Sequence, residues 1–173
     1  MKLYRAKIPE ISTNVIRILT DDGHIEVEAT NRLEAETDLV AIMEEYLKRD
    51  RMLRETVRER MARLSIPYDS YSKIRREQAQ EWNHPVGNKV EHYLARQFLE
   101  SFFLSNFVDE VYSQDNVIRT RILELLQDFD VDEQALRDEA REKVRNIQEN
   151  TVEYEIRFNQ ALKEVRKRHG LID

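Results

Sequence analysis

The chain has 173 residues, with 28 Lys and Arg against 34 Asp and Glu, which gives a formal net charge of -6. This acidic balance disfavours broad, non-specific binding of nucleic acid. The absence of cysteine excludes disulfides, Cys-ligated zinc and a Cys nucleophile, and only 3 Gly and 3 Pro disfavour a turn-rich all-β fold.

Four helices and one short strand are predicted in the first half. Pro9 suits the first turn of a helix that Asp21, Asp22 and Gly23 end. The alternation from His24 to Glu28 is the single strand-like signal. A second helix, capped by Thr30 or Asn31, is expected to run to about Lys48 with Leu33 on its apolar face. A third is expected from Asp50 to Pro67, with Leu64 on its own apolar face. A fourth is expected from about Ser70 to Pro85.

The stretch from Tyr93 to Tyr112 contains four of the six phenylalanines. Read as a helix, its apolar residues cover far more than the stripe of a surface helix, so we expect it to be buried on most sides. The predicted core includes Leu94, Phe98, Phe102 and Leu126. Further helices are expected from Asp115 and Asn116, from Val131 and Asp132, and from Asn150 and Thr151 to Gly170.

The two halves of the chain resemble each other. The segment LRETVRERMARL (Leu53 to Leu64) aligns without a gap with LRDEAREKVRNI (Leu136 to Ile147). Convergence of charged helices explains part of this match, but the shared order favours duplication. We therefore predict an all-α helical bundle built from two related four-helix-like units, residues 1–84 and 85–173, with at most a short extended segment near residues 24–28. Each unit is close to the lower size limit for an independent core, so the two should share an interface.

Three segments carry a resemblance to a known family: MKLYRAKIPEI with IRILTDDGHIEVE, VDEQALRDEAREKVRNIQENTVEYEIRF, and the ending RKRHGL. Over essentially the whole chain they resemble the two-unit form of an uncharacterised bacterial family, domain of unknown function 507. The chain departs from that pattern at Asn150, where the family has Gly, and at Tyr154, where it has Trp. The resemblance implies a cytoplasmic helical protein and no established activity or catalytic residues.

No catalytic, cofactor or metal site is predicted, and we expect the protein not to be an enzyme. Glu81 and His84 have the Glu-x-x-His spacing of a di-metal helical bundle, but a second copy is missing from the sequence and Pro85 ends the helix there. The four histidines are expected at helix ends or on polar faces, with no triad pattern. A site assembled from distant residues is the enzymatic alternative. No signal peptide or membrane span is expected either.

Two rows of arginines have helical spacing: Arg51, Arg54 and Arg58, and Arg137, Arg141 and Arg145. They could form anion- or partner-binding stripes, but interleaved carboxylates favour a neutralised, solvated face, each pair contributing roughly 0.3–0.5 kcal/mol. The carboxylates concerned are Glu55, Glu59, Glu133, Asp138 and Glu142. The cluster Lys163, Arg166, Lys167, Arg168 and His169 is less neutralised and suits a helix C-terminus.

We predict a protein–protein interaction or scaffolding module that binds another protein or a second copy of the chain. Aromatic and arginine side chains dominate interface energetics, so the expected contacts are Trp82, Arg54, Arg58, Arg137 and Arg141. Trp82 has the alternative of capping a core between the halves. The alternative function is a nucleic-acid-associated protein that uses the basic C-terminal helix, with anion contacts from Lys163, Arg166, Lys167 and Arg168.

Overall fold

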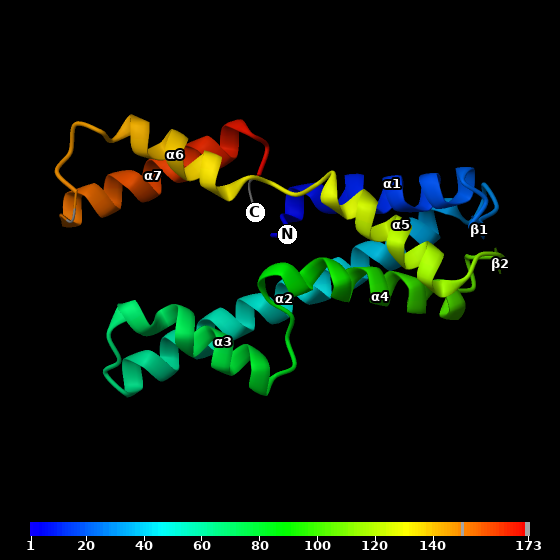
Figure 1. Ribbon diagram of the computed structural model, residues 1–173, viewed down its shortest axis with the longest axis horizontal. Coiled ribbons are helices and arrows are strands. Elements are labelled where there is room, and N and C mark those ends of the chain that lie inside the picture. Colours follow the sequence, from blue (N-terminus) through cyan, green and yellow to red (C-terminus); the bar gives the residue numbers. More distant parts are fainter. Residues whose placement is uncertain (150, 172–173) are drawn as a thin grey trace.

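The computed structural model describes residues 1–149 and 151–171 of the chain. Within these residues the fold is all-α, as predicted: seven α-helices accompany a two-stranded sheet and three short 3₁₀ turns (Figure 1). The elements are α1 (Ile8–Asp21), β1 (Ile25–Glu26), α2 (Arg32–Arg63), α3 (Tyr71–Glu81), α4 (Val90–Leu104), β2 (Glu110–Val111), α5 (Asp115–Gln127), α6 (Glu133–Lys143) and α7 (Val152–Arg168), with η1 (Arg5–Lys7), η2 (Tyr68–Ser70) and η3 (Gly87–Lys89).

A central bundle, residues 1–48 and 85–130, combines helices from both halves of the chain. Here α1 packs on α2 and α5, and α4 packs on the same two helices. One hydrophobic core joins all four helices, with Leu19, Leu39, Phe98 and Ile122 essentially inaccessible to solvent. The antiparallel pair β1–β2, in which Ile25 faces Val111, lies at one end of the bundle.

Two helical hairpins leave the bundle in the same direction (Figure 1). We call them arm 1, residues 49–84 (the second half of α2 with α3), and arm 2, residues 131–171 (α6 with α7). Each arm has a small apolar core, and the core of arm 2 also contains Tyr4 from the start of the chain. The core of arm 1 includes Leu53, Val57 and Ile74, and that of arm 2 includes Leu136 and Val165.

Helix α2 is longer than predicted. Its 32 residues run without a break from the bundle into arm 1, so the expected end near Lys48 and the new start at Asp50 are wrong. No Gly or Pro interrupts Arg32–Arg63. Asp50 lies in the middle of the helix and pairs with basic side chains, which removes its usual preference for a helix start.

Helix α4 is shorter than the Phe-rich stretch suggested. Phe98 and Phe102 are buried, together with Leu94 and Leu126, which confirms the predicted core. The helix ends at Leu104, and Phe103 is 57% exposed. It ends because Ser105 turns the chain: its hydroxyl donates to Asp38 at 2.5 Å and accepts from the Phe107 backbone N–H at 3.2 Å.

The helix starts in arm 2 agree with the sequence. The Asp132 side chain accepts hydrogen bonds from two backbone N–H groups at the start of α6, and the Thr151 hydroxyl caps α7 by accepting from the Tyr154 N–H. The other predicted cap of α7, Asn150, lies outside the described residues. Gly23 follows α1 with a φ of +71°, a conformation that glycine adopts without strain.

Two leucines placed on apolar stripes face solvent instead. Leu33 is 71% exposed and Leu64 is 55% exposed. Leu64 follows the last residue of α2, whereas Leu33, six residues before the buried Leu39, lies about 120° from it around the helix and so points away from the core. The predicted stripes are therefore correct at Met43, Leu53, Val57 and Met61, which are buried, and wrong at Leu33 and Leu64.

Replacing Phe102 by Ala should lower the free energy of unfolding by roughly 3–5 kcal/mol, because the side chain fills a core site that the surrounding helices cannot close. Urea denaturation monitored by circular dichroism measures this change. The matched control is Phe103→Ala, which removes the same atoms from an exposed position and should unfold near the wild-type midpoint. Equal midpoints for Phe102→Ala and wild type would contradict the assignment of α4 to the core.

Candidate functional site

The root of arm 1 contains a polar cluster, which we call the Asp50 cluster: Tyr46, Asp50, Arg54, Arg75 and His84. Arg75 Nη2 on α3 donates to Asp50 Oδ1 at 2.7 Å, and Arg54 Nε lies 3.2 Å from Asp50 Oδ2. His84 Nε2 is 3.5 Å from Oδ1, and its ring stacks on Tyr46 with centroids 5.0 Å apart. The cluster joins α2, α3 and the segment that leads into α4.

The electrostatics of this cluster favour an ionised Asp50. Burial raises the pKa of the carboxyl group, but the contact with His84, the hydrogen bond from Arg75 and the charges of Arg75 and Arg54 outweigh it and lower the pKa to about 2. Burial, reinforced by the nearby Asp50 charge, also raises the pKa of Tyr46. The tyrosine therefore stays neutral, and its hydroxyl donates to the Pro85 carbonyl at 3.3 Å.

His84 was expected at a helix end on the surface, but it is only 5% exposed. Neither of its ring nitrogens has a hydrogen-bond partner of normal geometry in the described part of the chain. The Glu-x-x-His pair does not come together: Glu81 lies on the surface, 3.6 Å from Arg60, whereas His84 faces Asp50. Among the described residues no group of three His, Cys, Asp or Glu side chains is placed to hold a metal ion.

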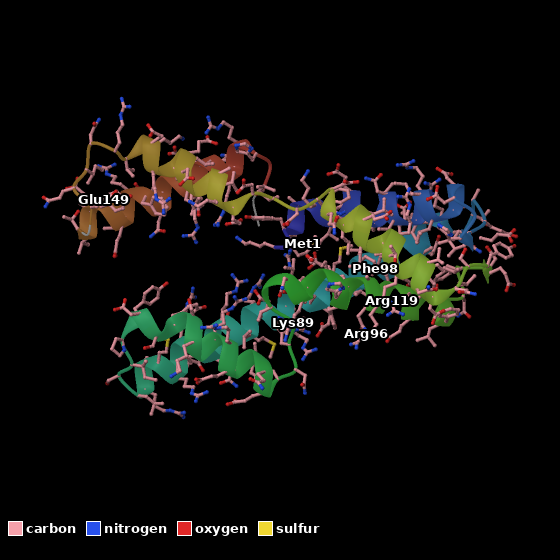
Figure 2. The ribbon with its side chains drawn as sticks, viewed as in Figure 1. Met1, Lys89, Arg96, Phe98, Arg119 and Glu149 are labelled. Carbon is pink, nitrogen blue, oxygen red and sulfur yellow. The ribbon has the colours of Figure 1, made fainter. Side chains whose placement is uncertain are left out.

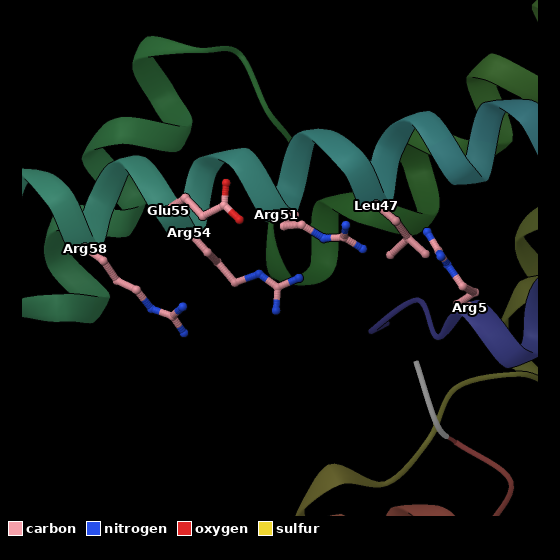
Figure 3. Close-up of a pocket in the computed structure, with 6 residues that line it drawn as sticks. All are labelled: Arg5, Leu47, Arg51, Arg54, Glu55 and Arg58. Carbon is pink, nitrogen blue, oxygen red and sulfur yellow. The ribbon is translucent and has the colours of Figure 1, made fainter.

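A pocket of about 240 Å³ lies along α2 where arm 1 meets the bundle. Arg51, Arg54 and Arg58 leave α2 on one side, and Leu47 lies beside Arg51 (Figure 3). We call this the arginine pocket, and its lining is completed by Glu55 and by Arg5 from η1. The sequence predicted this row as one helix face, and the structure adds Arg5 to it.

The predicted neutralisation of this row is wrong for two of its arginines. Within the described residues, neither Arg51 nor Arg58 has a carboxylate within 4 Å, although Glu55 and Glu59 are nearby in sequence. Arg54 does pair, but with Asp50. Helical spacing brings side chains near each other without fixing their rotamers, so interleaved charges need not pair.

The second arginine row follows the prediction more closely. Arg141 pairs with Asp138 at 2.5 Å, and Arg145 pairs with Glu142 at 3.6 Å. Arg137 is exposed on α6 and has no ion pair in the described residues. Arg137 and Arg141 lie on arm 2, on a different hairpin from Arg54 and Arg58, so the two rows do not form one continuous stripe on a single helix pair.

The basic C-terminal cluster is more neutralised than its sequence suggests. Arg166 pairs with Glu133 at 2.9 Å, and Arg168 pairs with Glu139. His169 Nε2 is 3.0 Å from Glu139 Oε2. Lys163 and Lys167 remain exposed on α7. The interpretation of an unneutralised cluster is therefore wrong, because α6 supplies carboxylates that sequence neighbours do not.

Trp82 is half-buried and packs against the core of arm 1, rather than against a core between the two halves. Its backbone carbonyl accepts a hydrogen bond from Arg49 at 3.2 Å. Part of the indole remains accessible, so the side chain contributes to the arm and borders its surface.

Both arms carry exposed apolar side chains at the ends far from the bundle. Leu64 is 55% exposed and Tyr68 81% exposed at the α2–α3 connection, and Val152 is 75% exposed and Ile156 53% exposed at the start of α7. Figure 1 shows these two connections at the outer ends of the arms, and Figure 2 shows side chains projecting from both hairpins. Sequence reasoning missed this pattern, although Val152 and Ile156 are spaced four residues apart outside the predicted stripe.

Comparison with known proteins gives one family. Residues 1–171 match a family described as "Protein of unknown function (DUF507)". No curated protein matches the chain. In the described residues, no helix is both long enough and apolar enough to cross a lipid bilayer.

Asp50→Asn should remove a pH-dependent part of the stability. Because the folded-state pKa is about 2 and the ordinary value is 3.8, the ionised carboxyl group contributes fully above about pH 4, and this contribution is lost as the pH falls through 2. Wild type should therefore lose about 2 kcal/mol more than the variant between pH 4 and pH 2.

Urea denaturation at a series of pH values measures the difference. The control is Asp69→Asn, which makes the same chemical change at an exposed position on arm 1 and should keep the wild-type pH dependence. Parallel pH profiles for wild type and Asp50→Asn would show that the carboxylate of Asp50 is not held by its neighbours.

Proposed function

The chain belongs to the DUF507 family, and because that family's description names no activity, we propose a function from the structure: a non-enzymatic protein-binding or scaffolding module that engages its partner with the two arms. The partner is another protein or a second copy of the chain. The bacterial and cytoplasmic setting that the resemblance implies is part of this proposal.

The exposed apolar ends of the arms carry the proposal. Leu64, Tyr68, Val152 and Ile156 contribute little to the small cores beside them, since each is more than half exposed. Tyr68 stacks on Tyr71 with ring centroids 5.6 Å apart, which holds the ring in place while leaving most of it accessible. Exposed aromatic and aliphatic side chains at fixed positions are suited to being buried in a protein interface.

We also infer that the two halves derive from one duplicated unit. The contact pattern supports this: exchanging α1 for α4 and the bundle part of α2 for α5 leaves the set of helix contacts in the bundle unchanged. The aligned residues Leu53, Met61, Leu136 and Val144 are all buried in the arms. Arm 1 then corresponds to arm 2, and the long helix α2 corresponds to α5 and α6 together.

Affinity purification of the tagged chain from its native host at endogenous level, with mass spectrometry and nucleic-acid staining of the eluate, tests the function. Serine at Leu64 and Tyr68, or at Val152 and Ile156, should reduce the captured partner by about tenfold or more, because interfaces depend on a few apolar anchors. A control with serine at Leu33 and Leu104, exposed residues beside the β1–β2 end, should capture the wild-type amount. Equal capture by all variants would contradict binding through the arms.

Nucleic acid should not bind measurably near 0.15 M salt. Each phosphate contact by a Lys or Arg adds about one unit to the slope of log affinity against log salt. The net charge is -6, and two of the arginines in the C-terminal cluster are already paired. Fluorescence anisotropy with labelled DNA and RNA measures this. Micromolar or tighter binding that is lost when Lys163, Arg166, Lys167 and Arg168 are neutralised would favour the nucleic-acid function instead.

A further inference from the structure

We propose that the arginine pocket of arm 1 binds an acidic segment of the partner protein, with two or three carboxylates on one side of it. This inference rests on the proposed function and adds the chemistry of the partner. The pocket is separate from the apolar ends of the arms, so the two contacts would be made by different parts of the same partner.

The geometry of the pocket suits a short row of carboxylates. Arg51 and Arg58 are seven residues apart on one helix, which separates them by about 10 Å along the axis. Acidic residues spaced three, four or seven apart on a partner helix cover the same length. Leu47 offers an apolar contact beside the guanidinium groups (Figure 3).

The charges of Arg51 and Arg58 in the pocket are not balanced within the described part of the chain. Asp50 is already shared by Arg54 and Arg75, and Arg51 and Arg58 have no carboxylate within 4 Å. Arm 1 as a whole has nine Lys and Arg against six Asp and Glu, whereas the bundle has ten against eighteen. Arm 2 has nine of each, so arm 1 is the part of this acidic protein that carries a net positive charge.

A protein segment fits this distribution better than a nucleic acid does. A duplex carries one charge per about 1.7 Å, so it would extend its charge past the pocket towards the acidic bundle. At that end Glu44 already pairs with Arg5 at 2.8 Å. Guanidinium groups bind carboxylates with two parallel hydrogen bonds, so a few well-spaced Glu or Asp side chains suffice.

Fluorescence anisotropy with the full chain tests the proposal. The labelled peptide is an alanine-rich helix with Glu at positions i, i+4 and i+7, and its control has Gln at those positions. At about 50 mM salt the Glu peptide should bind at least about tenfold more tightly than the Gln peptide, since exposed ion pairs strengthen as screening falls. The double variant Arg51→Gln, Arg58→Gln should bind both peptides equally weakly.

The matched control is Arg63→Gln, Arg76→Gln, which removes the same charge from exposed positions on arm 1 outside the pocket. It should retain most of the preference for the Glu peptide. Equal binding of the two peptides by wild type, or loss of the preference in both double variants, would overturn the proposal. Tighter binding of a single-stranded oligonucleotide of equal charge, lost in the pocket variant, would assign the pocket to nucleic acid instead. If the host partner still depends on the arm ends in any of these cases, the inference fails while the proposed function stands.

Discussion

The shared core of the bundle is the constraint on which the rest of the molecule depends. Each half of about 85 residues is close to the lower size limit for an independent core, and α1, α2, α4 and α5 bury apolar side chains against one another. The remaining helices can then extend from the bundle as hairpins, because the bundle core stabilises the ends to which they are attached. The arms are therefore secondary to the shared core in the stability of the molecule.

The Asp50 cluster sets the position of α3 and of the segment before α4 relative to α2. Apolar side chains would hold α3 against α2 almost equally well at several angles, because dispersion and hydrophobic contacts have little directional preference. A carboxylate between Arg54 and Arg75 has directional bonds, and Tyr46 and His84 extend the contact to the segment before α4. A buried ion pair is a weak source of net stability, so its effect here is better described as fixing one orientation.

Sequence reasoning located most helices because local signals determine where they start. Pro9, Asp132 and Thr151 lie at the expected positions, and the phenylalanine pattern identified the core. The errors have a common physical origin in contacts between residues far apart in the chain. Arg75 lets Asp50 lie inside a helix, and Ser105 bonds to Asp38 where a helix was expected to continue. The arginine pocket was harder to predict from the sequence than the fold. Whether Arg51 and Arg58 pair with a carboxylate depends on their rotamers, which helical spacing does not fix.

The continuity of α2 gives the two arms different mechanical properties. A helix of 32 residues is about 48 Å long, and bending it stretches its backbone hydrogen bonds, so arm 1 moves as a rigid extension of the bundle. Arm 2 is joined to α5 by the residues between Gln127 and Glu133, and it is also held to the start of the chain, because Tyr4 is buried in its core and Lys2 Nζ lies 3.3 Å from Glu133. A partner that draws the arms together would therefore have to bend a continuous helix to move arm 1, whereas to move arm 2 it would have to break these contacts with the N-terminal residues.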